Sequence, residues 1–420
     1  MNNSIVFLIG LFSSSACLGR VFAAETGGPA AAAMQTAWSE WTNGNVLQAE
    51  LLAEKQTGSD ESKHLLVLCS YVKGEYKKSL ARYATIAPLY EKRRELEDPV
   101  VQAYLHLGRF GEARDFAREQ KMSSPLLNQL ELRASHPLKT HLDKITVVPF
   151  AQHPLKSFFP AFEAELEGQK TTIHVDTGGT FLTMGPDRAK ALGIELVDAG
   201  KGFQASTSVP LQMGVAKSLV LGDATLNNVP VIVMPTLTGA QDFVIFGTNV
   251  LEPFLATLDY PDQRLILSPR NDEALRDKHM AMLSGEHKEL SFYMWGDHYM
   301  FARGGFGTGK ALNFFIDSGL VALSPEKAGL RQACFTTTAE CFQMWDVGKD
   351  ATAKEYFESP RPISLGPIAQ TNQFFVVTKN PSWLSFGGVR IDGLLGHGFL
   401  SKYAWTLDFD RRQYRFSEPR

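Results

Sequence analysis

The stretch that decides the fold reads IHVDTGGT at residues 173–180, and Asp176 is its acidic residue. A related stretch reads FFIDSGL at residues 314–320, with Asp317 in the same place. In each stretch an apolar run typical of a buried β-strand leads into Asp, a hydroxyl residue and Gly, and that triplet is typical of a turn. The chain therefore carries the same strand-and-turn pattern twice.

The duplication extends beyond these two stretches. Residues 244–268 align with residues 393–417 without a gap, at a constant offset of 149 (393 − 244). Both segments begin with an apolar run that ends in Gly, and both contain Thr-Leu-Asp followed by an aromatic residue. Around the acidic motifs the offset is 141 (317 − 176). A repeat of this length predicts two copies of one supersecondary unit that pack about a pseudo-two-fold axis.

These motifs resemble those of aspartic proteases of the pepsin and retropepsin type. The resemblance covers residues 145–420 and implies an all-β, bilobal body, with lobe one at residues 145–270 and lobe two at residues 285–420. Between the lobes, residues 271–283 could form a short helix. Because the chemistry needs two carboxylates and each lobe supplies one, the resemblance implies a monomer with an intramolecular site.

The resemblance also implies roles for the residues around each aspartate. Asp176 and Asp317 would form a catalytic dyad that holds a water molecule for attack on a peptide bond. Two carboxyl groups this close share one proton, so one acts as general base while the other polarises the carbonyl, and we expect activity to be highest in acid. The supporting residues would tie the two loops together and aim backbone amides at the carboxylates; they are Thr177, Gly178, Ser318 and Gly319.

A flap that closes over the substrate is also expected. In lobe one the candidate is GKGFQAS at residues 200–206, and Gly202, Phe203 and Gln204 are its predicted substrate contacts. In lobe two the candidate is the longer stretch at residues 342–358. Each would place a hairpin over the bound peptide.

Some positions depart from the family pattern. The residue after the Asp-Thr/Ser-Gly triplet is usually Ser, Thr or Ala, but it is Gly179 in copy one and Leu320 in copy two. Gly398 also stands where copy one has Asn249. The side chain of Leu320 cannot donate a hydrogen bond, so desolvation would raise the pKa of Asp317. Either Asp317 is then the protonated partner of the dyad, or lobe two has lost its catalytic role.

The N-terminal end of the chain reads as an export signal. Residues 1–23 contain a short apolar run at residues 5–11 and a small-residue cleavage site before Ala24, although the first residues lack Lys or Arg. The apolar run is too short to span a bilayer. We therefore expect a periplasmic or secreted protein with no membrane span, and the pattern around Cys17 disfavours a lipoprotein anchor.

Residues 24–135 are helical in pattern. Gly44, Gly74 and Gly108 each stand five residues before a small residue, within apolar helical spacing. This resembles tetratricopeptide repeats, in which a Gly marks the turn between paired helices. The fold class expected for the whole chain is thus an all-α helical-repeat domain followed by the all-β bilobal body. The helical domain would either offer a concave surface to a protein partner or cover one face of the body.

Composition and charge exclude several other classes. A formal net charge of −3 gives no case for nucleic acid or an anionic membrane. The scattered histidines form no metal-binding motif, and nothing in the sequence indicates a cofactor. Cys334 and Cys341 are close enough in sequence for a local disulfide, but two unpaired cysteines fit equally well.

The sequence thus predicts an exported aspartic endopeptidase that acts on peptide or protein substrates. A first alternative is a catalytically silent protein whose protease-like cleft binds a peptide or a protein, which Leu320 favours. A second alternative keeps lobe one alone as a retropepsin-like unit that pairs with another copy of itself. A serine or cysteine hydrolase is disfavoured because no Gly-x-Ser-x-Gly motif is present.

Overall fold

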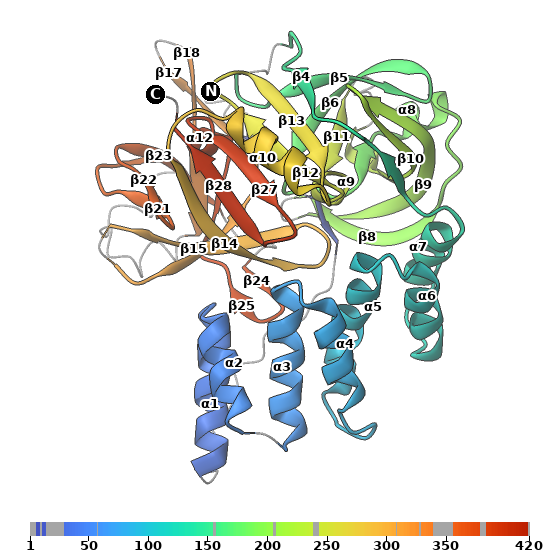
Figure 1. The fold of residues 1–420 in the computed structure, drawn as a ribbon, viewed down its shortest axis with the longest axis vertical. Coiled ribbons are helices and arrows are strands. Elements are labelled where there is room, and N and C mark those ends of the chain that lie inside the picture. Colours follow the sequence, from blue (N-terminus) through green and yellow to red (C-terminus); the bar gives the residue numbers. More distant parts are fainter. Residues whose placement is uncertain are drawn as a thin grey trace.

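A computed structural model describes residues 6–8, 11–13, 29–56, 58–153, 157–204, 207–237, 243–307, 309–326, 329–338, 356–378 and 384–418. It shows a helical N-terminal region followed by a β-rich, bilobal body (Figure 1). The helical region consists of α1 (Pro29–Thr42), α2 (Val46–Glu54), α3 (Asp60–Val72), α4 (Tyr76–Ala84), η1 (Arg93–Leu96), α5 (Glu97–His106), α6 (Phe110–Glu119) and α7 (Ser124–Ser135).

The helices form antiparallel pairs at the turns that the sequence predicted. Gly44, Gly74 and Gly108 lie between α1 and α2, α3 and α4, and α5 and α6, with φ angles of 76°, 79° and 69°. This left-handed conformation is accessible to Gly at little cost, which explains why Gly ends the first helix of each pair. The small residue five positions later is buried in each pair; these residues are Ala49, Ser79 and Ala113. Membership of the tetratricopeptide repeat family stays a prediction.

Lobe one is a β-sheet wrapped around the first acidic motif. Its order is β2-β8-β9-β5-β6-β11-β7-β10-β3 among the described residues. The elements of lobe one are β4 (Thr146–Pro149), β5 (Ala161–Leu166), β6 (Gln169–Asp176), β7 (Leu182–Met184), α8 (Pro186–Ala191), β8 (Val197–Gln204), β9 (Thr207–Leu221), β10 (Ala224–Val233), η2 (Pro235–Leu237), β11 (Val244–Gly247), α9 (Thr248–Leu251), β12 (Phe254–Asp259) and β13 (Arg264–Pro269).

Lobe two repeats this arrangement around the second motif. Strand β16 pairs in parallel with β26, as β6 pairs with β11 in lobe one. The elements of lobe two are β14 (His287–Trp295), β15 (Tyr299–Phe306), β16 (Leu312–Ile316), β17 (Leu320–Glu326), β18 (Gly329–Gln332), β19 (Phe335–Thr338), β20 (Tyr356–Ser359), β21 (Ile363–Leu365), β22 (Ile368–Gln370), β23 (Gln373–Thr378), β24 (Ser385–Phe386), β25 (Val389–Arg390), β26 (Gly393–Leu395), α12 (His397–Leu400), β27 (Ala404–Asp408) and β28 (Gln413–Ser417).

The two lobes share a sheet in which β12 of lobe one pairs with β27 of lobe two. These antiparallel strands come from equivalent parts of the repeat, and Thr257 faces its own counterpart Thr406. The two hydroxyl groups are 2.6 Å apart and hydrogen-bonded. Residues that the sequence relates by the offset of 149 thus meet face to face, as an approximate two-fold axis requires. The helix expected between the lobes is α10 (Glu273–Ala281), which packs beside β13.

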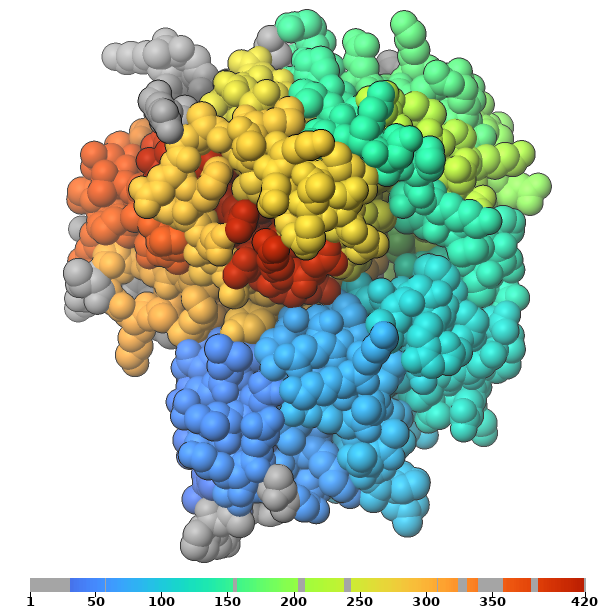
Figure 2. All heavy atoms as spheres, in the orientation of Figure 1, coloured from blue at the N-terminus to red at the C-terminus, as the bar shows by residue number. Residues whose placement is uncertain are grey.

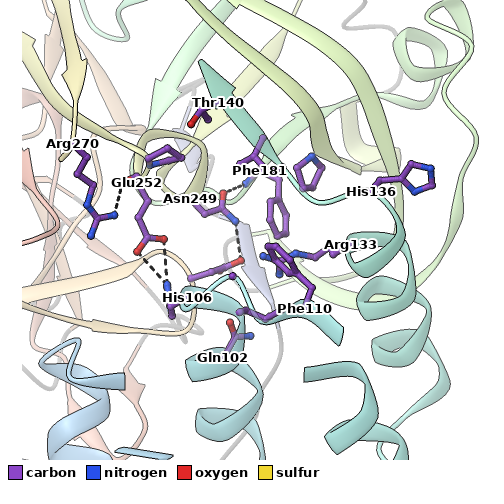
Figure 3. Close-up of a pocket in the computed structure, with 16 residues that line it drawn as sticks. Gln102, His106, Phe110, Arg133, His136, Thr140, Phe181, Asn249, Glu252 and Arg270 are labelled. Atoms are coloured by element: carbon purple, nitrogen blue, oxygen red, sulfur yellow. Dashed lines mark hydrogen bonds and ion pairs between the residues drawn. The ribbon is translucent and has the colours of Figure 1, made fainter. Parts of the chain in front are cut away.

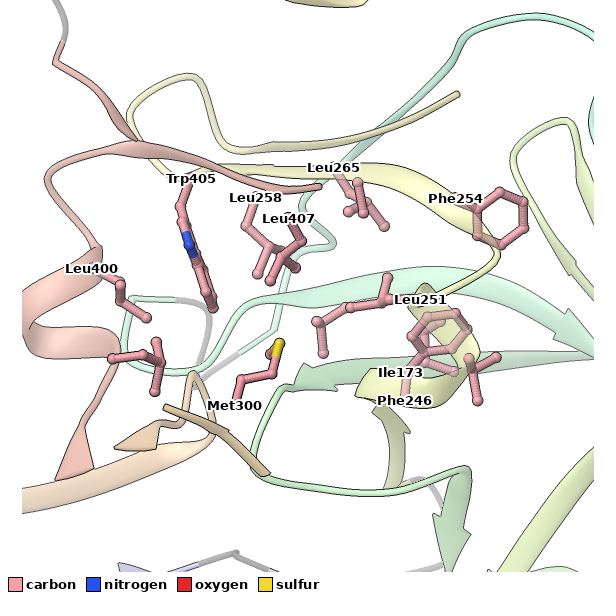
Figure 4. Packing of buried hydrophobic residues seen from close by; sticks show 14 of the residues in the cluster. Ile173, Phe246, Leu251, Phe254, Leu258, Leu265, Met300, Leu400, Trp405 and Leu407 are labelled. Atoms are coloured by element: carbon pink, nitrogen blue, oxygen red, sulfur yellow. The ribbon is translucent and has the colours of Figure 1, made fainter. Parts of the chain in front are cut away.

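One hydrophobic core runs through both lobes. Trp405 and Leu407 of β27 pack with Leu258 of β12, and Met300 of lobe two joins the cluster that contains Phe246 of lobe one (Figure 4). These side chains are buried because each strand of the shared sheet places its apolar face inward. The core therefore fixes the lobes to one another, which in turn fixes the distance between the two acidic loops.

The helical region packs tightly against the body, below both lobes in the view of Figures 1 and 2. The indole of Trp41 donates a hydrogen bond of 2.9 Å to the carbonyl of Gly387, and Arg412 donates one to the hydroxyl of Tyr76. A single apolar cluster contains residues of α1 to α5 and of lobe two. Of the two roles considered for the helices, covering a face of the body is thus observed.

Two short segments at the edges of these domains belong to the sheets. Strand β3 (Lys139–His141) pairs with β10 at the edge of the lobe-one sheet. Within the expected export signal, β1 (Val6–Leu8) pairs with β17 and β2 (Leu11–Ser13) pairs with β8. The export signal itself stays a prediction. Among the described residues, no helix is long and apolar enough to cross a membrane.

The structure bears on the cysteines only in part. Cys69 is buried in α3. Cys334 is also buried, but Cys341 lies outside the described residues, so the choice between a local disulfide and two thiols is left as the sequence posed it.

Candidate active site

The two aspartates end equivalent strands at the interface between the lobes. Strand β6 ends at Asp176, and β11 runs parallel to it with Gly247 opposite Asp176. In lobe two, β16 ends one residue before Asp317, and the amide of Asp317 donates to the carbonyl of Leu395 in β26 at 2.9 Å. The apolar run that ends in Gly thus pairs with the strand that carries each acidic loop.

The carboxyl groups of Asp176 and Asp317 lie against one another's loops. A Cβ atom placed on Gly178 would be 2.3–2.5 Å from the carboxyl atoms of Asp317, and one on Gly319 would be 2.2–2.5 Å from those of Asp176. Each Gly also donates its amide to the Oδ1 atom of its own Asp, at 2.8 and 2.9 Å. Neither Gly has a positive φ, so these positions require Gly because the opposite carboxyl group occupies the space of a side chain.

The hydroxyl residues next to the aspartates cross-link the two loops. The amide of Thr177 donates to Oγ of Ser318 at 3.0 Å, and the amide of Ser318 donates to Oγ1 of Thr177 at 2.9 Å. Each hydroxyl then donates to a carbonyl of the opposite lobe, from Thr177 to Ile316 and from Ser318 to Val175. All these groups are buried, so the lattice holds the two acidic loops in one geometry.

Burial governs the electrostatics of the pair. Burial, together with the charge of Asp317, raises the pKa of Asp176 well above its usual range. Burial also raises the pKa of Asp317, to about 6. The Oδ2 atom of each Asp is buried and accepts no hydrogen bond from the described residues. These oxygens therefore lack the hydrogen bonds that hold each Oδ1 atom, which leaves them available to a proton or a ligand.

Leu320 does not intrude between the aspartates. Its side chain is buried in the apolar cluster that contains Phe315 and Leu394, and it packs against Gly396, where a Cβ would be only 2.7 Å from that of Leu320. Burial has the largest effect on the pKa of Asp317 and raises it; the hydrogen bonds of Asp176, of the Gly319 amide and, least, of the Leu320 amide lower it. The departure from the family pattern is thus accommodated by core packing.

The predicted flap of lobe one is one strand of a hairpin. Gly202, Phe203 and Gln204 end β8, where they pair with residues 207–209 of β9. Helix α7 supports the base of this hairpin, since Gln129 donates to the carbonyl of Ala199 at 2.9 Å. The candidate flap of lobe two lies outside the described residues, apart from residues 356–358, which belong to β20.

A half-buried hairpin turn of lobe two reaches the acidic loop of lobe one, and no sequence pattern predicted this contact. Oδ2 of Asp297 accepts hydrogen bonds from Thr180 Oγ1 at 2.8 Å and from Asn249 Nδ2 at 3.0 Å. Its Oδ1 lies 2.6 Å from Nδ1 of His298. Although burial opposes it, the hydrogen bond to His298 holds the pKa of Asp297 well below its usual range. Asp297 is therefore an ionised tie between the lobes.

The same turn is held from the other side by the helical region. The carbonyl of Gly296 accepts from the hydroxyl of Tyr71 at 3.3 Å and lies 2.9 Å from Nε2 of His106. Beyond the turn, Oδ1 of Asn249 accepts the amide of Phe181, which has a φ of 51°. This conformation is unfavourable for an aromatic residue, so the hydrogen bond helps to hold it beside the acidic loop. In the sequence, the local signal for the lobe-two turn is the pair Gly296-Asp297, which predicts a turn and no function.

Comparisons with known proteins find similarity over part of the chain. Residues 162–250, from β5 to α9, match the family model described as aspartyl protease. A retropepsin-like aspartic protease from Rickettsia conorii is 20% identical, covering 31% of this chain and 92% of its own, with a TM-score of 0.24. The aspartic proteinase from Irpex lacteus is 11% identical, covering 66% and 97%, with a TM-score of 0.40. No curated protein matches the chain.

Proposed function

We propose that the protein is an aspartic endopeptidase that hydrolyses peptide bonds with a water molecule activated by Asp176 and Asp317 of the same chain. The observation that carries the proposal is the mutual fit of the two loops, in which Gly178 and Gly319 each leave room for the carboxyl group of the opposite lobe. The aspartyl protease family match over lobe one supports the same reaction class.

The proposed chemistry follows from the buried pair. One carboxylate takes a proton from water as the water attacks the peptide carbonyl, while the other, protonated, donates a hydrogen bond to the carbonyl oxygen. The amides of Gly178 and Gly319 stabilise negative charge on the Oδ1 atoms. Protonation of the leaving nitrogen then returns the pair to its singly protonated form. No cofactor or metal enters this scheme.

The pH dependence of this chemistry differs from the acid optimum that the family resemblance implies. Activity needs one proton on the pair, so it rises as the first carboxyl group ionises and falls as the second does. Burial raises the pKa of Asp317 to about 6 and that of Asp176 well above its ordinary value. We therefore expect kcat/KM to increase with pH through about 6 and to be highest near neutrality.

The alternative of a catalytically silent peptide-binding protein was based on Leu320. Because that side chain packs in the core, it gives no reason to expect an inactive site. The alternative of lobe-one dimers needs a second copy for a geometry that the two lobes of one chain already supply. We keep export to the periplasm or outside the cell as part of the proposal, on the leader pattern of residues 1–23. A protein partner for the helical region is likewise only proposed.

The test is cleavage of a mixed peptide library by the purified protein across pH 3–8, with and without a pepstatin-type inhibitor. Asp176→Asn and Asp317→Asn run beside the wild type, and circular dichroism verifies their folding. Cleavage that is inhibited and is absent from both variants supports the proposal. Folded wild-type protein that cleaves no peptide at any pH contradicts it.

A further inference from the structure

A cavity of about 310 Å³ lies where the helical region meets both lobes. Figure 3 shows it between the ends of α5, α6 and α7 on one side and the segments around Phe181 and Asn249 on the other. Its volume is at the lower end of the range for small-molecule sites in proteins, about 300–1,000 Å³. The cavity is outside the catalytic dyad, and the proposed hydrolysis makes no use of it.

One cationic side chain in the cavity wall, that of Arg133, contacts aromatic rings but forms no hydrogen bond or ion pair with the described residues. Arg133, in the last turn of α7, is half-buried, and its guanidinium lies 5.4 Å from the ring centre of Phe110 and 4.9 Å from that of Phe181. Burial lowers its pKa, yet a guanidinium remains charged at neutral pH. Its hydrogen-bond donors are therefore free to bind a ligand.

The other charged groups in the wall already have partners. Both oxygens of Asp297 are hydrogen-bonded, as described above. Both carboxylate oxygens of Glu252 lie 3.2 Å from Nδ1 of His106. The guanidinium of Arg270 donates to Asp410 and to the carbonyl of Glu252. Asp297 and Glu252 still act on Arg133 over a distance, but neither supplies an acceptor to it.

A second polar group and apolar walls complete the cavity. The Oε1 atom of Gln102 in α5 is buried and accepts no hydrogen bond from the described residues. A buried acceptor of this kind favours a ligand with an N–H donor. Leu105, Leu138 and Pro253 contribute apolar surface to the wall. The cavity thus offers a cation, an acceptor and apolar surface.

We propose that this cavity binds the carboxyl-terminal residue of a peptide that has an apolar side chain. The carboxylate pairs with Arg133, the amide N–H of the same residue donates to Gln102, and the side chain packs on the apolar wall. These three groups occur together in a C-terminal amino acid and are absent from inorganic anions. The ligand contacts Phe181, whose amide is bonded to Asn249, so it lies beside the acidic loop of lobe one without entering the site.

The test is isothermal titration calorimetry of the full chain with N-acetyl-L-leucine at neutral pH. A ligand of this size is expected to bind with a Kd on the order of 1 mM. N-acetyl-L-leucinamide lacks only the carboxylate, and we expect it to bind at least about tenfold more weakly. The ligand could be a free acylated amino acid or the end of a peptide chain. A tetrapeptide that ends in leucine distinguishes the two, since tighter binding than N-acetyl-L-leucine indicates a peptide chain.

Variants assign the binding to the cavity. Arg133→Gln is expected to weaken N-acetyl-L-leucine binding about tenfold, whereas Arg118→Gln, at an exposed arginine of the neighbouring helix, leaves it unchanged. If Arg133→Gln does not fold, two tests remain. Gln102→Leu should weaken binding because it removes the acceptor for the amide N–H of the ligand, and the carboxamide comparison uses the wild type. The proposal is wrong if folded wild-type protein shows no binding, if the carboxamide or Arg133→Gln binds equally well, or if inorganic phosphate binds as tightly. None of these outcomes depends on peptide cleavage.

Discussion

The two lobes place their aspartates on the same backbone frame but surround them with different side chains. In lobe one, Thr180 and Asn249 hydrogen-bond to one another at 2.9 Å and both donate to Asp297. The equivalent positions of lobe two hold Val321 and Gly398, which have no polar side chain. Strand pairing, glycine and the hydroxyl lattice therefore suffice to position a carboxyl group. The hydrogen bonds among Thr180, Asn249 and Asp297 are an addition at the loop of lobe one.

A second difference lies behind the acidic loops. Thr248 donates to the carbonyl of Thr177 at 2.8 Å and thereby holds the loop of lobe one. His397, its counterpart in the repeat, instead lies 2.8 Å from Oε1 of Gln332. The loop of lobe two is held by the packing of Leu320 on Gly396. A polar contact in lobe one and an apolar contact in lobe two thus stabilise the same turn. The residues that support the turn therefore differ between the lobes, whereas the Asp, the hydroxyl residue and the Gly of the turn itself are kept.

The largest expected effect comes from neutralising either aspartate. Asp176→Asn and Asp317→Asn each remove one member of the pair, so each should lower kcat about 10³-fold or more. The measurement is steady-state hydrolysis of one peptide substrate. Equal losses mean that both lobes are catalytic despite their different surroundings. Substantial activity in Asp317→Asn alone would show that lobe two has lost its catalytic role.

The next effect tests the space between the loops. Gly178→Ala and Gly319→Ala place a methyl group within 2.5 Å of the opposite carboxyl group, so each should lower kcat/KM about 100-fold and reduce the midpoint of thermal unfolding. Gly111→Ala on α6, where nothing lies within 4 Å, is the matched control and should leave both unchanged or raise stability slightly. Normal activity in either site variant contradicts the proposed closeness of the loops.

A smaller effect is expected from removing the charge of Asp297, which hydrogen-bonds to side chains beside the acidic loop of lobe one. Asp297→Asn removes the charge that organises Thr180, Asn249 and His298, and we expect kcat to fall about tenfold with little change in KM. Asp262→Asn, at an exposed aspartate of a surface turn, should leave both constants unchanged. Unchanged kcat in folded Asp297→Asn would mean that the tie serves stability alone, and that the two loops are equally independent of their side-chain surroundings.

The smallest expected effect concerns stability and pH. Burial raises the pKa of Asp317 from an ordinary value near 3.8 to about 6, so the folded protein binds this proton more tightly than the unfolded chain. The stabilisation is complete below about pH 4 and is lost as the pH rises through about 6. Asp317→Asn should therefore exceed the wild type in stability above pH 7, and this advantage should shrink in acid. Thermal unfolding at several pH values measures it, and an advantage that grows in acid refutes it.

Much of the bilobal body could be predicted because the relevant signals are local and occur twice. The strand-and-turn pattern around Asp176 and Asp317, together with the offset between the copies, was enough to place two acidic loops at one axis. The hydroxyl and glycine neighbours followed from the family resemblance, although the reason for glycine is the opposite carboxyl group and not backbone conformation.

The rest of the site depends on contacts between distant parts of the chain. Asp297 and Thr180 are 117 residues apart, and neither belongs to a periodic pattern or a recognised motif. The surroundings of Arg133 involve helices and both lobes, so its lack of a partner is visible only once the domains are packed. The orientation of Leu320 was likewise undetermined, because a bulky residue after a turn can point to the cleft or to the core.

The contact between α7 and β8 ties the predicted flap of lobe one to the helical region. Gln129 and Asn128 donate hydrogen bonds to the carbonyls of Ala199 and Asp198, and Pro125 packs against Gly200, whose φ is 85°. The hairpin is therefore anchored at its base by a helix that lies outside the two lobes. Under the proposed function, we expect a change in the packing of α7 to alter substrate binding without touching either aspartate.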